Sequence, residues 1–462
     1  MNATEEKTDL AKVKYYPDRF YICLDGFDLE NLLTFSTDIS ITQQQTIFIH
    51  EYYHYLTNIA SYSGLRQFCL NFVDRYRCIT NIAFNEHLDG FPLDKNSFKS
   101  CNELLNYYFD ALSILDNDDI DMSLIRECGL VPSGKFEIDE ISIIDEDMNF
   151  KINGSDVYGV KHRVKINISG LIGMDHFFLT FGAIDEFLSA SIDEFFFEND
   201  FGDVDPNMLN SRPYYPYRVL DDIFKYFNFD RPSSLVKILI SYCSINSSNP
   251  PTTLINLLKE IEKVGKDFFL EKPEQFLLSI IPKHDEETLL KYIHDFSEEL
   301  YSQDKIHISQ ALRYYGDKFY AGSKFKQSDF FYFIRPFFQN VENTKGKQRF
   351  LLDFSRIINQ FVPPVILYNG EFKVFDKLTN YGESTCIMIA TYEIFESLRF
   401  HRIAHRTEDR KTKYTFPDSM VECDDFTKFT PPPIFGAWRL ALNELGLYRL
   451  YLEENNLKEL TK

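Results

Sequence analysis

The stretch TQQQTIFIHEYYHYLTNIASYS, residues 42–63, is the part of the chain from which its fold and function are interpreted first. It contains neither proline nor glycine, and the pattern of its apolar residues, Ile47, Leu56 and Ile59 among them, is helical. Gly64 follows directly and is a residue type that interrupts helices. We therefore expect one helix over this stretch, a break at Gly64 and a second helix after it.

Two histidines in this predicted helix are separated by about one turn. Positions i and i+4 share a face of a helix, so His50 and His54 can both direct a ring nitrogen at one ion about 2 Å away, which is the ligand geometry of zinc. Glu51 lies one residue beyond the first ligand and can take a proton from a water on the metal without binding the metal itself. The spacing therefore predicts a Zn²⁺ site with Glu51 as the catalytic general base.

The segment His50-Glu51-Tyr52-Tyr53-His54 resembles the H-E-x-x-H helix of the zincin metallopeptidases. Catalytic zinc usually has three protein ligands and a water, so the resemblance implies a third ligand. The segment at 181–194 is similar to the later helix of the gluzincins, in which a Glu completes the set. That residue is Glu186 here, and Glu194 is the next choice.

One feature of this segment departs from the gluzincin pattern. In that family an Asp four residues after the third ligand commonly orients a histidine, but this chain has Ala190 at that position. The orienting role therefore passes to Asp193 or Asp185. The resemblance covers two short helices only. The alternative interpretation is that both histidines form ordinary hydrogen bonds and that Glu186 is a solvated helix carboxylate.

Two other groups of residues are weaker candidates for a functional role. His401 and His405 also have i, i+4 spacing, but no acid follows His401, so a basic helix end is the favoured interpretation. The functional alternative is that this basic segment receives an acidic stretch of a substrate or partner. A second group of four residues follows the 181–194 segment in the chain and could donate hydrogen bonds to a tetrahedral oxyanion. A role in packing is the favoured interpretation for these residues, which are Tyr214, Tyr215, Tyr217 and Arg218.

The rest of the chain predicts an α+β fold that is mainly helical, with small antiparallel sheet elements. Residues 20–36 are expected to be extended, residues 135–170 alternate around the turn signal Asn153-Gly154, and a second hairpin signal ends at Asn369-Gly370. Helical patterns occupy 97–116, 183–198, 217–228, 233–244, 252–270, 286–303, 305–315, 384–406 and 436–455.

The length of 462 residues favours two domains. We expect a zincin-like catalytic domain at 1–240, with the hairpin region of about 135–170 inserted in it. A mostly helical second domain is expected at 241–462, which gives the chain a helical C-terminal region.

The composition restricts the class of partner. The chain has 70 acidic and 49 basic residues and a formal net charge of −21, which disfavours nucleic acid and anionic lipid as partners. Its 8 cysteines are scattered without a Cys-x-x-Cys pair, as suits a reducing compartment. No signal-peptide pattern and no long uncharged apolar run is visible in the sequence. We therefore expect a cytoplasmic protein without a membrane partner.

These observations together predict a zinc-dependent hydrolase that is an intracellular peptidase acting on a protein or peptide substrate. Sheet elements at 20–25 or 135–168 could hold an extended substrate as an added strand. Two alternatives stay open. One is a non-catalytic protein-interaction module with an inert or structural metal site, and the other is a metallohydrolase of small amides or esters. No feature of the sequence specifies an oligomeric state.

Overall fold

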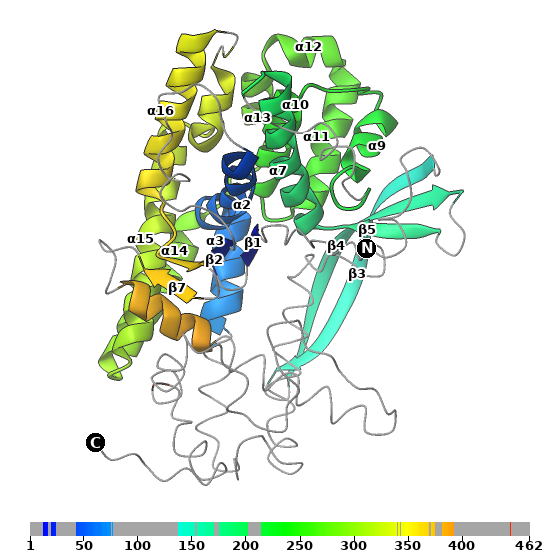
Figure 1. The fold of residues 1–462 in the computed structure, drawn as a ribbon. Coiled ribbons are helices and arrows are strands. Elements are labelled where there is room, and N and C mark those ends of the chain that lie inside the picture. Colours follow the sequence, from blue (N-terminus) through cyan, green and yellow to red (C-terminus); the bar gives the residue numbers. More distant parts are fainter. Residues whose placement is uncertain are drawn as a thin grey trace, which may run out of the picture.

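The fold is taken from a computed structural model, in which the described residues are 13–16, 20–24, 43–74, 76, 137–152, 155–170, 175–201, 214–339, 341, 343–368, 371–374, 381–391 and 444. Helices make up most of this part, and they include a helical region in the C-terminal half (Figure 1). The strands form one antiparallel sheet of three and one sheet of four. The expected α+β class with a mainly helical composition is confirmed.

Helix α2 (Gln43–Ala60) is the helix expected from residues 42–63. It ends where Ser61 caps the next helix, α3 (Tyr62–Phe68), by accepting a hydrogen bond from the backbone N–H of Gly64 at 2.9 Å. A Cβ atom at Gly64 would lie 2.0 Å from the carbonyl oxygen of Asn58. The chain therefore needs glycine for this close turn between two helices, and the π-helical segment η1 (Cys69–Asp74) continues from α3.

The four-strand sheet joins two strands near the N-terminus with a hairpin from the C-terminal half. Its order is β1 (Val13–Tyr16), β2 (Tyr21–Leu24), β6 (Val365–Tyr368) and β7 (Glu371–Val374). β1 and β2 are antiparallel, as are β6 and β7, whereas β2 and β6 run parallel. The expected extended segment and the second expected hairpin are both present. Their pairing within one sheet has no local signal in the sequence and was not predicted.

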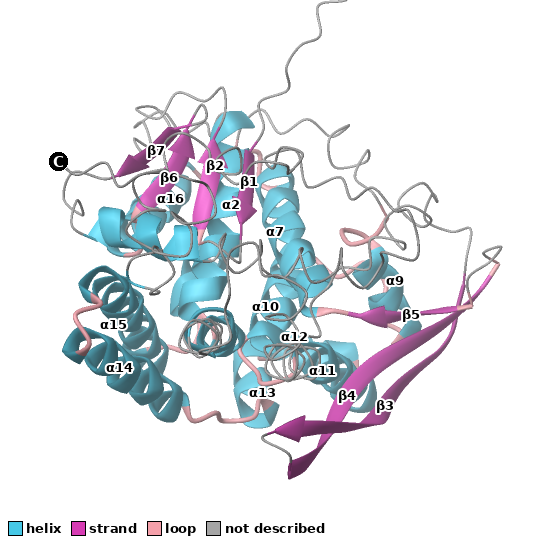
Figure 2. Cartoon of the chain, turned by 90° about the horizontal axis from the view of Figure 1, so that it is seen from below, coloured by secondary structure: helices cyan, strands magenta, loops and turns pink. Residues whose placement is uncertain are grey.

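The three-strand sheet confirms the expected hairpin between helices. β3 (Glu137–Ile152) and β4 (Ser155–Ser169) pair antiparallel along their whole lengths, and β5 (His176–Leu179) pairs with β4. β5 leads directly into α7 (Phe181–Glu198), which Thr180 caps by accepting a hydrogen bond from Ala183 N–H at 3.2 Å. Figure 2 shows the two sheets on different sides of the helical body.

The remaining helices follow the expected order, but several differ from the expectation. The single helix expected over 252–270 is divided at Gly265, whose φ of 90° is unfavourable for other residues. The helix expected over 305–315 continues to Ser328, and α13, η2 and α16 were not anticipated. The elements are α9 (Val219–Tyr226), α10 (Ser234–Ile245), α11 (Pro250–Val264), α12 (Lys266–Glu271), α13 (Pro273–Ile280), α14 (Glu286–Ser302), α15 (Ile306–Ser328), η2 (Tyr332–Phe338) and α16 (Thr344–Gln360).

Some sequence expectations lie partly or wholly outside the described residues. The helix expected at 97–116 lies outside the described residues, as does the one expected at 436–455 except for residue 444. Of the helix expected at 384–406, the part up to residue 391 is described, and it is helical. The domain boundary at residue 240 stays a prediction, and that residue lies within α10. Among the described helices, none is both long enough and apolar enough to cross a membrane.

An aromatic core fixes the orientation of α2. Tyr52 and Tyr53, the two middle residues of the histidine segment, have exposed fractions of 0% and 1%. The ring of Tyr53 stacks on Phe354 of α16 with centroids 5.8 Å apart, and its hydroxyl donates to the carbonyl of Phe333 at 3.1 Å. Because these tyrosines anchor α2 to the C-terminal half, the helix cannot rotate freely, and its histidines are directed at α7.

Candidate metal centre

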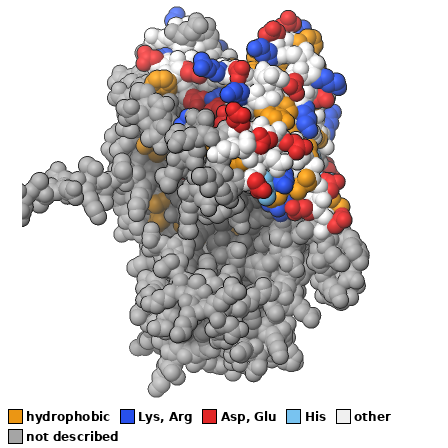
Figure 3. All heavy atoms as spheres, turned by 90° about the vertical axis from the view of Figure 1, so that its right-hand side faces the viewer, with side chains coloured by type: hydrophobic (Ala, Val, Ile, Leu, Met, Phe, Trp, Pro, Cys, Tyr) orange, Lys and Arg blue, Asp and Glu red, His pale blue; other side chains and the backbone are white. Residues whose placement is uncertain are grey.

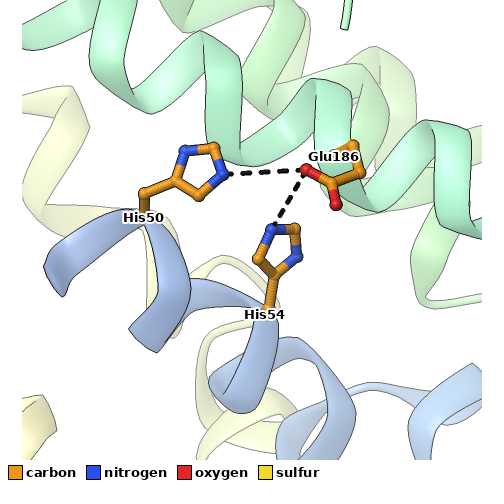
Figure 4. Close-up of side chains that lie close together, drawn as sticks. All are labelled: His50, His54 and Glu186. Atoms are coloured by element: carbon orange, nitrogen blue, oxygen red, sulfur yellow. Dashed lines mark ion pairs between the residues drawn. The ribbon is translucent and has the colours of Figure 1, made fainter. Parts of the chain in front are cut away.

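The predicted ligands His50, His54 and Glu186 come together between two helices. Both histidines project from α2 and the carboxylate projects from α7 toward them (Figure 4). Their ligand atoms all lie within 4.8 Å of one another. Oε2 of Glu186 is 3.4 Å from Nε2 of His54 and 3.7 Å from Nε2 of His50. The three ligands predicted from the sequence therefore lie together as one possible metal-binding group.

These distances suit a metal ion. Two ligand atoms of a tetrahedral zinc, with bonds of 2.0–2.2 Å, lie roughly 3.3–3.6 Å apart. The two histidine-to-glutamate distances are close to that separation. In addition, the buried Oε2 atom of Glu186 has no hydrogen-bond partner among the described residues. A buried carboxylate oxygen requires compensation, and a cation held by the three side chains would supply it.

Two further carboxylates bind the histidines on the side away from Glu186, one carboxylate for each histidine. Asp193 lies 2.8 Å from Nδ1 of His50, and Asp185 lies 2.7 Å from Nδ1 of His54. Asp185 also accepts a hydrogen bond from the hydroxyl of Thr57 at 2.8 Å. An Nδ1–H bonded to a carboxylate leaves the lone pair of the imidazole on Nε2, which is the atom that faces Glu186. Both aspartates named as candidates for this role therefore occupy it, one for each histidine.

The register of α7 explains how one helix supplies all three carboxylates. Asp193 follows Glu186 by seven residues, which is about two helical turns, so both lie on one face. Asp185 is adjacent to Glu186 and reaches the second histidine. Ser189 and Ala190 lie between Glu186 and Asp193 in the helix and have exposed fractions of 0% and 4%. Their small side chains allow α7 to approach α2 closely at the level of the histidines.

The carboxylates favour positive charge at this position. Burial opposes the protonation of His50, but the charge and hydrogen bond of Asp193 and the nearby Glu186 outweigh it and raise the pKa from 6.5 to about 9. For His54, burial is outweighed in the same way by Asp185 and Glu186, and the pKa is raised. Burial alone would raise the pKa of Glu186, yet the two imidazoles lower it. A divalent cation in place of two protons would leave the net charge of the group unchanged.

Glu51, the predicted general base, is not one of the clustered ligand residues. Its Oε2 atom accepts a hydrogen bond from the backbone N–H of Tyr15 at 2.6 Å, so the edge strand β1 holds the carboxylate in place. The side chain is only partly buried. This partly buried carboxylate follows the ligand residue His50 in the chain and is fixed by a backbone donor, while its role as general base stays a prediction. The contact with β1 was not foreseen, because it joins residues of two separate elements.

The alternative third ligand points elsewhere. Oε2 of Glu194 accepts a hydrogen bond from the ammonium group of Lys237 at 2.8 Å, and Lys237 also pairs with Asp221 at 2.7 Å. Glu194 is therefore bound into the contact between α7 and α10, and it does not belong to the group of possible ligands. Glu186 is the carboxylate that faces both histidines.

The structure separates the four residues considered for hydrogen bonding to an oxyanion. The hydroxyl of Tyr214 donates to Asp222 at 2.6 Å, and that of Tyr215 lies 3.2 Å from the hydroxyl of Thr180. The ring of Tyr217 lies beside His50, with centroids 6.4 Å apart. Arg218 precedes α9 at its N-cap. The remaining candidates, His401 and His405, lie outside the described residues.

Comparison with known proteins finds no matching family model, no matching curated protein and no matching solved structure. The candidate site is therefore defined by its own geometry: a His-His-Glu group that could hold a metal ion.

Proposed function

We propose that this chain is a zinc-dependent hydrolase and that its preferred reaction is the cleavage of peptide bonds. The observation that carries the proposal is the convergence of His50, His54 and Glu186, with a buried aspartate behind each histidine. Two imidazoles and one carboxylate are the ligand set of many catalytic zinc sites, which keep a fourth position for water. The other three-ligand sets common for zinc also use nitrogen donors of this kind, whereas Ca²⁺ and Mg²⁺ favour oxygen ligands alone.

Each residue near the site has a defined task in the proposed reaction. When bound, zinc would polarise the scissile carbonyl and lower the pKa of a water molecule. Glu51 accepts the proton of the attacking water and returns it to the leaving amine. The Tyr15 N–H keeps the Glu51 carboxylate in one orientation during both transfers. Tyr217, beside His50, is our candidate for donating a hydrogen bond to the developing oxyanion.

The proposed substrate is a protein or peptide, and the proposed location is the cytoplasm. The described cysteines Cys23, Cys69, Cys243 and Cys386 are free thiols, which supports a reducing compartment. The spacing of the histidine segment and its resemblance to zincins support a peptidase. Against this, a metallohydrolase of small amides or esters would use the same ligands, and an interaction module could hold the ion without turnover.

The test separates metal binding from catalysis by means of one substitution. In Glu51→Gln the amide cannot accept a proton, so the protein should keep its fold and about one zinc per chain. Hydrolysis should fall by at least about 10²-fold. Cells producing wild-type or Glu51→Gln protein are compared by proteomics for new peptide termini, and zinc is measured in both purified proteins.

The possible results point to different conclusions. Termini that depend on Glu51 support a peptidase. Identical termini, together with retained zinc and retained partner binding, would replace the peptidase by an interaction module. Loss of zinc from Glu51→Gln would mean that Glu51 is a ligand. Absence of any metal from wild-type protein purified without chelators would remove the site.

A further inference from the structure

The outer edge of β3 is a second feature of the molecule that points to a partner. The order of the sheet is β3-β4-β5, so β4 pairs with one side of β3, and no described strand pairs with the other side. An edge strand presents backbone N–H and C=O groups that can pair with a further strand. β3 is 16 residues long and lies with β4 at the periphery of the helical body (Figures 1 and 2).

The side chains of this strand carry one sign of charge. Between residues 137 and 147, six of the eleven residues are acidic and none is basic. All but Glu146 are exposed, and the six are Glu137, Asp139, Glu140, Asp145, Glu146 and Asp147. In β4, by contrast, residues 160–169 contain three basic residues and no acidic one. Figure 3 views the molecule from this side, where acidic and basic side chains are interspersed over the described surface.

β4 shows what kind of strand β3 accepts as a neighbour. Asp145 lies 2.6 Å from Nδ1 of His162, and Glu146 accepts a hydrogen bond from Arg163 at 3.3 Å. Side chains of an edge strand point above and below the sheet, so a strand added on the outer side also comes within reach of them. Neither Glu137 nor Asp147 forms an ion pair with any described residue. These two carboxylates are available to a new neighbour.

We propose that the outer edge of β3 binds an extended segment of another protein, rich in Lys and Arg, as an added strand. The backbone of the segment pairs with β3, and its basic side chains pair with the acidic ones. A second copy of this chain is not the occupant, because two β3 strands side by side would place like charges opposite each other. The binding does not need a metal ion, so the proposal does not rest on the proposed hydrolase activity.

The probe is a fluorescein-labelled peptide with the sequence of residues 160–169, VKHRVKINIS, which is the strand that β3 already accepts. Fluorescence anisotropy is measured while full-length protein is added. Binding is expected, and it should weaken as ionic strength rises, because exposed charges are screened. A peptide with Glu in place of its three basic residues should not bind. A peptide with Pro in place of its central Val should bind poorly, because proline disrupts a strand ladder.

Two pairs of substitutions locate the site. Glu137→Lys with Asp147→Lys should weaken binding by about fivefold or more, since two attractive cross-strand pairs become repulsive. The control is Glu271→Lys with Asp295→Lys, which changes the net charge equally at exposed positions on α12 and α14 and should leave the affinity unchanged. Hydrogen exchange of β3 amides between residues 137 and 147 should become slower in the presence of the peptide.

Three results would overturn the proposal. They are equal binding of the basic and acidic peptides, equal weakening by both pairs of substitutions, and unchanged exchange of the β3 amides in the presence of bound peptide. If the β3 variant does not fold, the peptide variants provide the same test on unaltered protein. Glu186→Gln should bind the peptide like wild type, so failure of the metal site and failure of this surface are recognised separately.

Discussion

Replacing Asp193 by Asn is the sharpest single perturbation of the candidate metal centre. The two side chains have nearly the same shape, so the packing between α7 and α2 should survive. The carboxylate accepts from Nδ1 of His50 at 2.8 Å, whereas an amide can direct its own N–H groups at that atom. The imidazole would then carry its proton on Nε2, the atom that faces Glu186. A protonated nitrogen cannot bind a metal, so the substitution should weaken zinc binding through the tautomer of His50.

The expected size follows from the geometry. Loss of a partner that orients a metal-binding histidine typically costs about 10–100-fold in metal affinity. Asp193 and Asp185 act on different histidines, each over a buried contact of less than 3 Å. Their effects should therefore multiply, and the double variant Asp193→Asn with Asp185→Asn should lose about 10²–10⁴-fold. Thr57→Val, which removes one hydrogen bond to Asp185, should have a smaller effect than either single substitution.

The assay is competition for zinc with a chromophoric chelator, with circular dichroism as a check of folding. The matched control is Asp222→Asn, which removes an aspartate that accepts a hydrogen bond from Tyr214 at 2.6 Å outside the ligand group. It should retain the affinity of wild type. Wild-type affinity in both single variants, or an equal loss in the control, would refute the assignment of the two aspartates as orienting residues.

Three further predictions concern the ligands, the proton load of the metal-free site and the general base. Glu186→Gln should release zinc, as elemental analysis would show, while Glu194→Gln should keep it, because that carboxylate binds another helix. In chelated protein, the raised pKa of His50 contributes stability fully present below pH 6.5 and lost as pH rises toward 9, on the order of 3 kcal/mol in urea unfolding. A free energy of unfolding that does not change over this pH range in chelated protein would contradict the protonation of His50 in the metal-free site. Tyr15→Pro, which lacks the N–H that Glu51 accepts, should reduce the Glu51-dependent peptide termini more than Tyr15→Val, which keeps the N–H; equal effects would assign the loss to the tyrosine ring.

Features that depend on one helix could be predicted from the sequence. The spacing of His50 and His54 and the helical pattern around them are properties of a single segment, and α2 confirms them. The identity of the residue opposite them needed a second helix, and small residues around Glu186 were the signal that one would approach. The pairing of β3 with β4 could also be predicted, because both segments alternate and the turn signal between them, Asn153-Gly154, is local in the sequence.

Features that depend on contacts between distant segments could not be predicted in the same way. Asp193 and Asp185 are both plausible partners by spacing, and only the packing of α7 on α2 assigns each to one histidine. The pairing of Ile22 with Ile366 is set by the whole chain and leaves no trace in either strand. The same holds for the bond between Tyr15 and Glu51. In each case the sequence shows which residues could interact, and only the tertiary structure determines which of them are in contact.

The cost of burying so many ionisable groups is itself an argument about function. Asp193 has an exposed fraction of 1%, and Asp185 and both histidines are also buried. Charges removed from water destabilise a fold unless hydrogen bonds and opposite charges compensate for the loss of solvation. The bonds of the aspartates to the histidines and to Thr57 provide part of that compensation. Oε2 of Glu186 lies near both imidazoles but has no hydrogen-bond partner among the described residues. A metal ion would complete it. A structural ion would do so as well, whereas the proposed reaction also uses the carboxylate of Glu51, which is partly buried and bonded to β1. Glu51 is therefore the residue on which the distinction between binding a metal and using it depends.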